Sequence, residues 1–185
     1  MLTVNQVARR LVRVTDKVDS KTWEQGKQWY VQARQFCIET ASLYGISLVQ
    51  VIGVLAVLSP QCNWEHNKAT TRELIHTRAI LHYQGYKHNI KKAERILEGE
   101  HPEYVLSGAK VRAFYHNILA PEVSKSVTVD THIIRLAFNL QRLEMKHESY
   151  VFDKGRKGNM VIQAAYRKVA VKYHLRPCEL QAITW

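Results

Sequence analysis

The sequence has few of the features that stabilise small secreted scaffolds or that anchor proteins in membranes. Its three cysteines, Cys37, Cys62 and Cys178, are too few for a disulfide framework, and they form no paired-thiolate metal motif. The longest apolar run, Leu48–Leu58, is interrupted by Gln50 and is too short to cross a bilayer. The first dozen residues alternate polar, apolar and basic types, unlike a signal peptide. We therefore expect a cytoplasmic protein with no membrane partner.

Sequence signals for metals and nucleotide cofactors are also lacking. The nine histidines include no H-x-x-x-H or H-E-x-x-H pair, which would place two ligands on one helix face. No glycine-rich nucleotide loop and no Walker-type sequence is present. We therefore predict a protein without a metal site and without a cofactor.

Positive charge, by contrast, is abundant. The 185 residues include 27 Lys and Arg against 16 Asp and Glu, which gives a formal net charge of +11. Such an excess makes a polyanion the first partner to consider, and nucleic acid is the commonest one. Composition leaves open the alternative that the charge only keeps the protein soluble. The 46% of hydrophobic residues is enough for a sizeable core.

Apolar residues recur at helical spacing along most of the chain, and strand signals are weak. The segments with this spacing are 3–14, 22–44, 47–58, 65–82, 86–97, 103–119 as two short helices, a segment from about 130, and 160–174. Pro60 is expected to end the apolar helix before it. Residues 145–159 read as a charged, exposed connector, and the tail up to Trp185 is expected to dock on the core. The predicted fold class is all-α, with roughly eight or more helices.

Three segments carry candidate chemistry, and the first is Leu-Ser-Gly-Ala-Lys-Val-Arg at residues 106–112. Gly108 permits a tight turn between two short helices. The second helix then presents free backbone N–H groups that suit a phosphate oxygen, and Lys110 and Arg112 add charge there. A plain turn with solvated basic residues is the alternative interpretation.

The second segment is Val-Thr-Val-Asp-Thr-His-Ile-Ile-Arg at residues 127–135. Asp130 at a helix start is held by backbone N–H groups, which suits an ordinary N-cap. A cap and a catalytic role are compatible, because a buried, ionised carboxylate is what an oxocarbenium-like transition state requires. His132 follows closely and is a candidate to orient Asp130.

The third segment, Leu-Ser-Pro-Gln-Cys-Asn at residues 58–63, directly follows the apolar helix. A polar amide after a helix-ending proline sits on a rigid edge, which suits insertion of Gln61 into a DNA stack. The alternative is a loop in which Gln61 and Asn63 satisfy nearby backbone groups.

Together and in this order, the three segments resemble the helix–hairpin–helix DNA glycosylase superfamily, closest in pattern to endonuclease III. That family has L-P-G-V-G-x-K followed by V-D-T-H-[VI]-x-R, and this chain has LSGAKVR and VDTHIIR. Arg112 and Asp130 are 18 residues apart, as the corresponding family residues are. The resemblance covers residues 48–140, about half of the chain.

The resemblance implies a two-lobed helical unit over residues 1–185 with a cleft between the lobes. Residues 42–124 would form one lobe and contain the hairpin at about 103–119, and residues 1–41 plus 125–185 would form the other. We expect Asp130 and Gly108 to face the same groove. The implied activity is binding of double-stranded DNA, flipping of a modified or mispaired base, and cleavage of its N-glycosidic bond.

The resemblance also implies roles for single residues. Asp130 is the expected catalytic carboxylate, and Gln61 would fill part of the space that the flipped base leaves. The residues expected to contact DNA are Gln61, Asn63, Ser107, Gly108, Lys110, Arg112, Thr131 and His132.

Three departures from the family pattern change these expectations. Arg112 stands where bifunctional members have the lysine that forms an imine, and a guanidinium stays protonated, so we expect a monofunctional enzyme without lyase activity. Ser107 and Lys110 replace the usual proline and glycine of the hairpin, and Lys110 would strain a turn that needs positive φ there. The four-cysteine iron–sulfur cluster is missing.

Two alternatives remain at this point. The same scaffold, short and without the cluster, suits base hypermodification in the DNA of a virus or mobile element. For either enzyme we expect a cytoplasmic, nucleoid-associated location in a prokaryotic or virus-infected cell. The other alternative is a DNA-binding module without catalysis. The sequence does not predict an oligomeric state.

Overall fold

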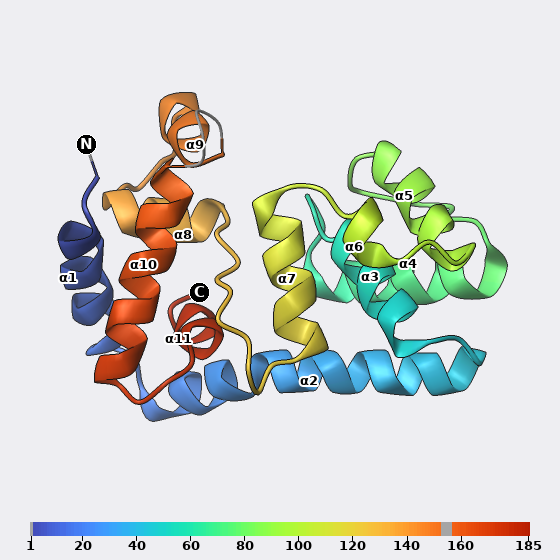
Figure 1. Ribbon diagram of the computed structural model, residues 1–185, viewed down its shortest axis with the longest axis horizontal. Coiled ribbons are helices and arrows are strands. Elements are labelled where there is room, and N and C mark those ends of the chain that lie inside the picture. Colours follow the sequence, from blue (N-terminus) through green and yellow to red (C-terminus); the bar gives the residue numbers. More distant parts are fainter. Residues whose placement is uncertain (1, 153–156) are drawn as a thin grey trace. The chain divides into compact units, whose positions relative to one another are not determined.

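A computed structural model describes residues 2–152 and 157–185, and throughout this part of the chain the regular structure is helical, with no β-strand. This confirms the all-α prediction. The helices are α1 (Val4–Thr15), α2 (Ser20–Tyr44), α3 (Leu48–Leu58), α4 (Trp64–Thr77), α5 (His88–Leu97), α6 (Pro102–Val105), α7 (Ala109–Leu119), α8 (Thr131–Phe138), α9 (Met145–Phe152), α10 (Lys157–Lys172) and α11 (Pro177–Ile183) (Figure 1).

The chain divides into two compact units. Unit 1 combines Met1–Val31 with Ala120–Trp185, and unit 2 is the continuous stretch Gln32–Leu119. The long helix α2 contributes residues to both. The resemblance implied a lobe boundary at 42 and 124, whereas the structure changes unit between residues 31 and 32 and between residues 119 and 120.

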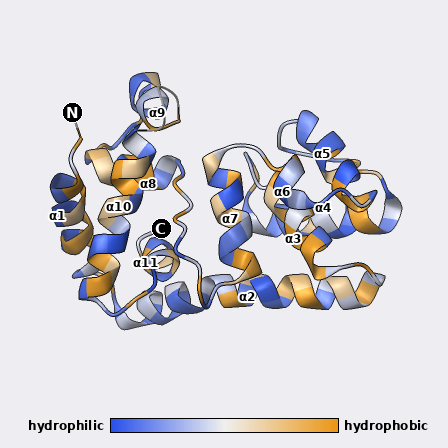
Figure 2. Cartoon of the chain, in the orientation of Figure 1, coloured by the Kyte–Doolittle hydropathy of each residue, from blue (hydrophilic) through white to orange (hydrophobic). Residues whose placement is uncertain are grey.

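Unit 1 is built around α1, α8 and α10. Helix α1 packs against both α8 and α10, and α10 also contacts α9 and α11. In Figure 2, hydrophilic and hydrophobic colours alternate along α10, as expected for a helix with one buried side. The core of unit 1 includes the fully buried side chains of Leu11, Ile133, Ile134, Ile162 and Tyr166.

Unit 2 is built around α3. Every residue from Val51 to Leu58 is buried, because α4, α5, α6 and α7 all contact this helix. Ser47 begins α3 as an N-cap that accepts a hydrogen bond from the backbone N–H of Gln50. The helix ends at Leu58, immediately before Ser59 and Pro60, as the sequence predicted.

Two predicted boundaries differ from the structure, and the prediction for the tail is confirmed. Helix α4 ends at Thr77, not near residue 82, because Arg78 takes a left-handed conformation with φ 60°. The expected connector at 145–159 is wrong in large part, since α9 and the start of α10 occupy it, and its residues 153–156 lie outside the described residues. The expected docking of the tail is confirmed by buried Leu180 and Ile183 in helix α11.

Within the described residues, no single helix is long and apolar enough to cross a membrane. Helices α2 and α3 have enough length and apolar character only when taken together, and the chain bends by 120° at the break between them.

Candidate active site and hairpin

Asp130 caps the N-terminus of α8. Its backbone is extended (φ −114°, ψ −171°), and its Oδ1 accepts a hydrogen bond from the backbone N–H of Ile133 at 3.0 Å. The residue is only 5% exposed. The predicted helix start at Asp130 is therefore confirmed, and the cap fixes the direction of the carboxylate.

The second carboxylate oxygen of Asp130 is engaged by a tryptophan from the far end of the chain. The indole Nε1 of Trp185 donates to Oδ2 at 2.7 Å. The Trp185 ring stands edge to face against Trp29, with 5.2 Å between ring centroids, and Trp29 makes a similar contact with Tyr30 at 4.8 Å. Both oxygens of Asp130 thus face N–H donors, which suits a carboxylate because it can only accept hydrogen bonds.

Unit 1 also contains hydrogen-bonded hydroxyl groups, and Tyr30, Thr128 and Tyr166 among them are buried. The Tyr30 hydroxyl donates to Oε1 of Gln181 at 2.6 Å and is 2.9 Å from the hydroxyl of Thr128. The hydroxyl of Tyr166 lies 3.0 Å from that of Thr184. Burial, and to a smaller extent the negative charge of Asp130, raises the pKa of Tyr166 above its ordinary value. The phenol therefore stays protonated at neutral pH.

Thr131 and His132 lie at the start of α8 and are exposed. Nη2 of Arg135 lies 2.7 Å from Nδ1 of His132, so this histidine pairs along its own helix. The hydrogen-bonding partner of His132 is thus Arg135. The sequence suggested that His132 orients Asp130, but the side chain that contacts the Asp130 carboxylate is Trp185.

The hairpin in unit 2 consists of α6, a three-residue turn and α7. Gly108 has φ +83°, and an added Cβ there would meet no atom within 4 Å, so the glycine is required by backbone conformation alone. Its carbonyl accepts from the backbone N–H of Arg112 at 3.2 Å and begins α7. Lys110 lies inside α7, not at a positive φ, so the strain expected at this residue does not arise.

Side chains tie the hairpin to its neighbours. Nζ of Lys92, on the basic helix α5, donates to the Ser107 hydroxyl at 2.6 Å. Nη2 of Arg112 donates to the backbone carbonyl of Glu103 at 2.6 Å and lies 3.7 Å from the Glu103 carboxylate. The predicted phosphate contacts of Ser107 and Arg112 would therefore compete with bonds that already hold the turn together.

The loop after α3 places Gln61 in a strained conformation. The backbone N–H of Cys62 donates to the carbonyl of Ser59 at 3.2 Å, which closes a turn, and Gln61 occupies its third position with φ 64°. Glycine or asparagine is usual at such a position. The Gln61 side chain is exposed, and its Nε2 donates to the Tyr86 hydroxyl at 3.3 Å. Asn63 caps α4 by accepting from the N–H of His66 at 2.9 Å.

The predicted site residues fall in both units. Unit 2 contains Gln61, Asn63, Ser107, Gly108, Lys110 and Arg112, and unit 1 contains Asp130, Thr131 and His132. Sequence reasoning missed the contact of Trp185 with Asp130, although it expected the tail to dock. The signal available in the sequence was the indole N–H of Trp185, a hydrogen-bond donor in an otherwise apolar terminal segment.

A family model matches residues 1–185, and its description is a family of unknown function, DUF7178. The chain belongs to this family. No curated protein and no solved structure matches this DUF7178 chain. Any assignment of chemistry to DUF7178 residues therefore rests on their geometry.

Metal-binding geometry does not form in the described part of this DUF7178 protein, where no group of three or more His, Cys, Asp or Glu residues could hold an ion. Cys37 and Cys178 are buried in different units, and Cys62 is half-buried. Burial raises the pKa of Cys37 to about 12 and that of Cys178 to about 11. Neutral thiols that are divided between the two units do not fit the iron–sulfur cluster of the family that the motifs resemble.

Proposed function

We propose that this protein binds double-stranded DNA and cleaves the N-glycosidic bond of a flipped, modified or mispaired base, with Asp130 as the catalytic carboxylate. The proposal includes the two-lobed arrangement and the cleft that the resemblance implies. The observation that carries it is the setting of Asp130, a buried carboxylate held by two N–H donors at the start of a helix.

Such a carboxylate suits the chemistry of base release. As the glycosidic bond breaks, the base leaves with the electron pair and positive charge develops on the sugar. Asp130 would stabilise that charge or accept a proton from the water that attacks C1′. The new bond joins the water oxygen to C1′, and the departing base takes up a proton. Arg112 cannot form an imine with the sugar, so the product is an intact strand with an abasic site.

Trp185 has a positioning role in this proposal. Its indole N–H fixes Oδ2 of Asp130 at 2.7 Å, and the ring is held by the edge-to-face contact with Trp29. Trp185 is 45% exposed, so the aromatic surface next to the carboxylate reaches solvent. Stacking of a base on an exposed aromatic ring is a common means of holding single nucleotides.

The hairpin supports the DNA-binding part of the proposal. The left-handed Gly108 leads directly into the eleven-residue helix α7, and the first N–H groups of a helix favour anions. Lys92 lies against the turn through its bond to Ser107, which adds positive charge at the same place.

The deciding experiment tests Asp130→Asn against Trp185→Phe on duplexes that carry different lesions, including hypermodified bases, and scores abasic sites with and without alkali. The Asp130→Asn side chain keeps one oxygen for the cap and then turns its amide N–H groups toward the indole, whereas Trp185→Phe removes only the indole donor. We expect Asp130→Asn to reduce base release by at least about 100-fold and Trp185→Phe to reduce it much less. Strand breaks that appear only after alkali would support the monofunctional assignment.

A second candidate, a DNA-binding protein without catalysis, is favoured by one observation. Asp130 is 5% exposed and both of its oxygens are occupied, as expected for a purely structural cap. This alternative predicts unchanged, salt-sensitive duplex binding by a stably folded Asp130→Asn variant and no abasic sites from the wild type on any duplex.

A further inference from the structure

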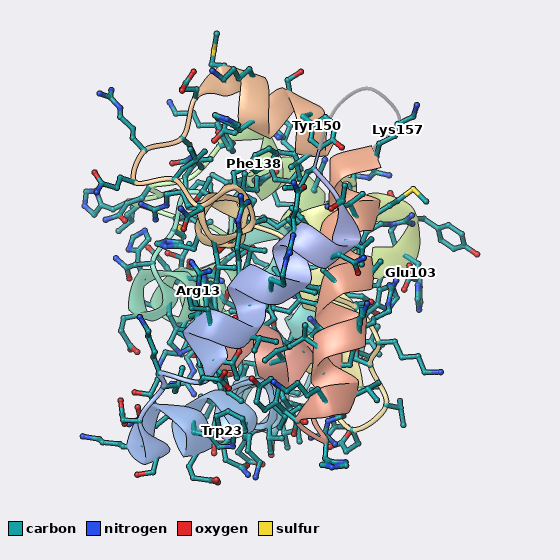
Figure 3. The ribbon with its side chains drawn as sticks, turned by 90° about the vertical axis from the view of Figure 1, so that its left-hand side faces the viewer. Arg13, Trp23, Glu103, Phe138, Tyr150 and Lys157 are labelled. Carbon is teal, nitrogen blue, oxygen red and sulfur yellow. The ribbon has the colours of Figure 1, made fainter. Side chains whose placement is uncertain are left out.

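A hollow lined by arginines lies between α1 and the C-terminal end of α8 in unit 1. Its volume is about 510 Å³, within the usual range for small-ligand pockets. Figure 3 labels Arg13 on α1 and Phe138 at the end of α8, the two helices that border it. The lining residues are Arg10, Arg13, Val14, Arg135, Leu136, Asn139, Leu140 and Gln141.

The three guanidinium groups of this hollow have no carboxylate partner among the described residues. Arg10 donates to the backbone carbonyl of Ala137, and Arg135 pairs with the ring of His132. The side chain of Arg13 is exposed and has no hydrogen bond or ion pair among the described residues. The lining includes no Asp or Glu. Three positive charges of one hollow are thus left without a neutralising anion.

The contacts among the described residues leave all three charges unneutralised, although Arg10 and Arg135 each have a hydrogen-bonding partner. Arg10 satisfies a carbonyl at the C-terminus of α8, where a cation is favoured by the helix dipole. Arg13 lies in the last turn of α1, where the dipole also favours a cation, but its side chain bonds no carbonyl and no carboxylate in the described part of the chain. Asn139 and Gln141 add amide groups that can donate to an anion, and Val14, Leu136 and Leu140 reduce the water that would compete for it.

We propose that the hollow between α1 and α8 is a binding site for phosphate oxyanions. Guanidinium groups match the oxygens of a phosphate in pairs, and several of them around one hollow suit a group with two or more negative charges. Two sources offer this chemistry, the phosphodiester backbone of DNA and a small oligophosphate such as pyrophosphate. The site uses no atom of Asp130 and does not rest on the proposed glycosylase activity.

A neighbouring surface of α1 provides the matched control. Arg9 lies on the same helix and is exposed, but it lines a different hollow, between α1 and α10, together with Lys168 and Lys172. Arg9→Gln therefore removes one charge from the same helix without changing the lining of the arginine hollow.

The test measures the binding of pyrophosphate by calorimetry, and of a duplex as a function of salt, to the full chain. The variants are Arg13→Gln, Arg13→Gln/Arg135→Gln and Arg9→Gln, with Arg13→Lys as the conservative replacement. We expect the double variant to weaken pyrophosphate binding at least about tenfold and Arg9→Gln to change it less than about twofold. Arg13→Lys keeps the charge but loses the paired donors, so it should lie between wild type and Arg13→Gln.

The duplex arm distinguishes the two sources. If the DNA backbone occupies the hollow, the double variant loses duplex affinity, and the slope of log K against log salt becomes less steep by about two, one for each lost phosphate contact. If a free oligophosphate is the ligand, pyrophosphate binding falls while duplex binding stays unchanged. The proposal is overturned if the double variant binds both pyrophosphate and the duplex as well as the wild type does. It is also overturned if Arg9→Gln loses as much affinity as the double variant. Asp130 does not line the hollow. If Asp130→Asn failed to reduce base release, the proposed glycosylase activity would be contradicted, but the phosphate-binding result would stand.

Discussion

The two units differ in net charge and in whether they are built from one continuous stretch of the chain or from two. Unit 1 has 17 Lys and Arg against 9 Asp and Glu, a net charge of +8, whereas unit 2 has 10 against 7, a net charge of +3. The hairpin belongs to the less charged unit, and Asp130 and the arginine hollow belong to the more charged one. The hairpin that resembles a DNA-binding motif thus lies outside the unit that has the larger net positive charge.

The units also differ in how their candidate residues are held. In unit 1, Asp130 is buried and accepts a side-chain hydrogen bond from Trp185, and Tyr30 donates to Gln181 over a longer sequence distance. In unit 2, Gln61, Ser107 and Gly108 are exposed and held by local backbone geometry. Unit 1 is therefore the more sensitive to changes in packing, and unit 2 to changes in turn conformation.

The largest expected effect comes from Gly26→Ala in unit 1. A Cβ at Gly26 would lie 2.6 Å from the Cα and 2.7 Å from the backbone N of Ile183, and a helix backbone has little freedom to yield. We expect a loss of about 3 kcal/mol in unfolding free energy and displacement of α11. Since Trp185 follows α11, the tryptophan fluorescence should also change. Gly45→Ala adds a Cβ that meets no neighbour, so its cost measures only the strain of alanine at φ +65° and shows what an added methyl group costs without a clash.

Gly53→Ala makes the corresponding test in unit 2. The added Cβ would lie 2.6 Å from Cγ of Pro102, a rigid ring at the start of α6. We expect a smaller loss of about 2 kcal/mol, because the overlap is with ring carbons of Pro102 and not with main-chain atoms. Denaturant unfolding followed by circular dichroism measures it. A cost that equals or exceeds that of Gly26→Ala would contradict the greater packing sensitivity assigned to unit 1.

The smallest expected effect concerns the strained turn at Gln61. Gln61→Gly removes the left-handed strain and should raise the unfolding free energy by at most about 1 kcal/mol. Gln61→Ala keeps the strain and should not raise it. If the amide side chain acts in DNA, both variants lose base release to the same extent while only the glycine variant gains thermal stability. Full activity in both variants would show that the strained residue has no part in the reaction.

Most helices were predictable because their signals are local. The apolar run of α3 ends at a serine followed by a proline, and α8 begins at an aspartate cap, so periodicity and capping chemistry were enough. Helix α4 stops at Arg78 with no glycine or proline to announce it, while apolar residues continue beyond. Helix α9 buries only Val151, so its sequence resembles a charged loop.

The candidate site was predictable only in part. Asp130 and Gly108 were found because motif residues and turn residues carry their own chemical signature. The Trp185 contact joins residues 55 positions apart, and the arginine hollow joins α1 to α8 across more than a hundred residues. Such pairs depend on tertiary packing, which no local pattern encodes.

The assembly of unit 1 from two separated stretches has a consequence for how the protein is made. During synthesis, residues 1–31 leave the ribosome well before residues 120–185, whose α8 and α10 cover the apolar side of α1. Unit 2 is continuous and can fold first, which would shorten the effective loop that unit 1 must close. Until then, α1 remains a nascent amphipathic segment in need of protection, and a pause in translation after residue 119 would prolong that exposure.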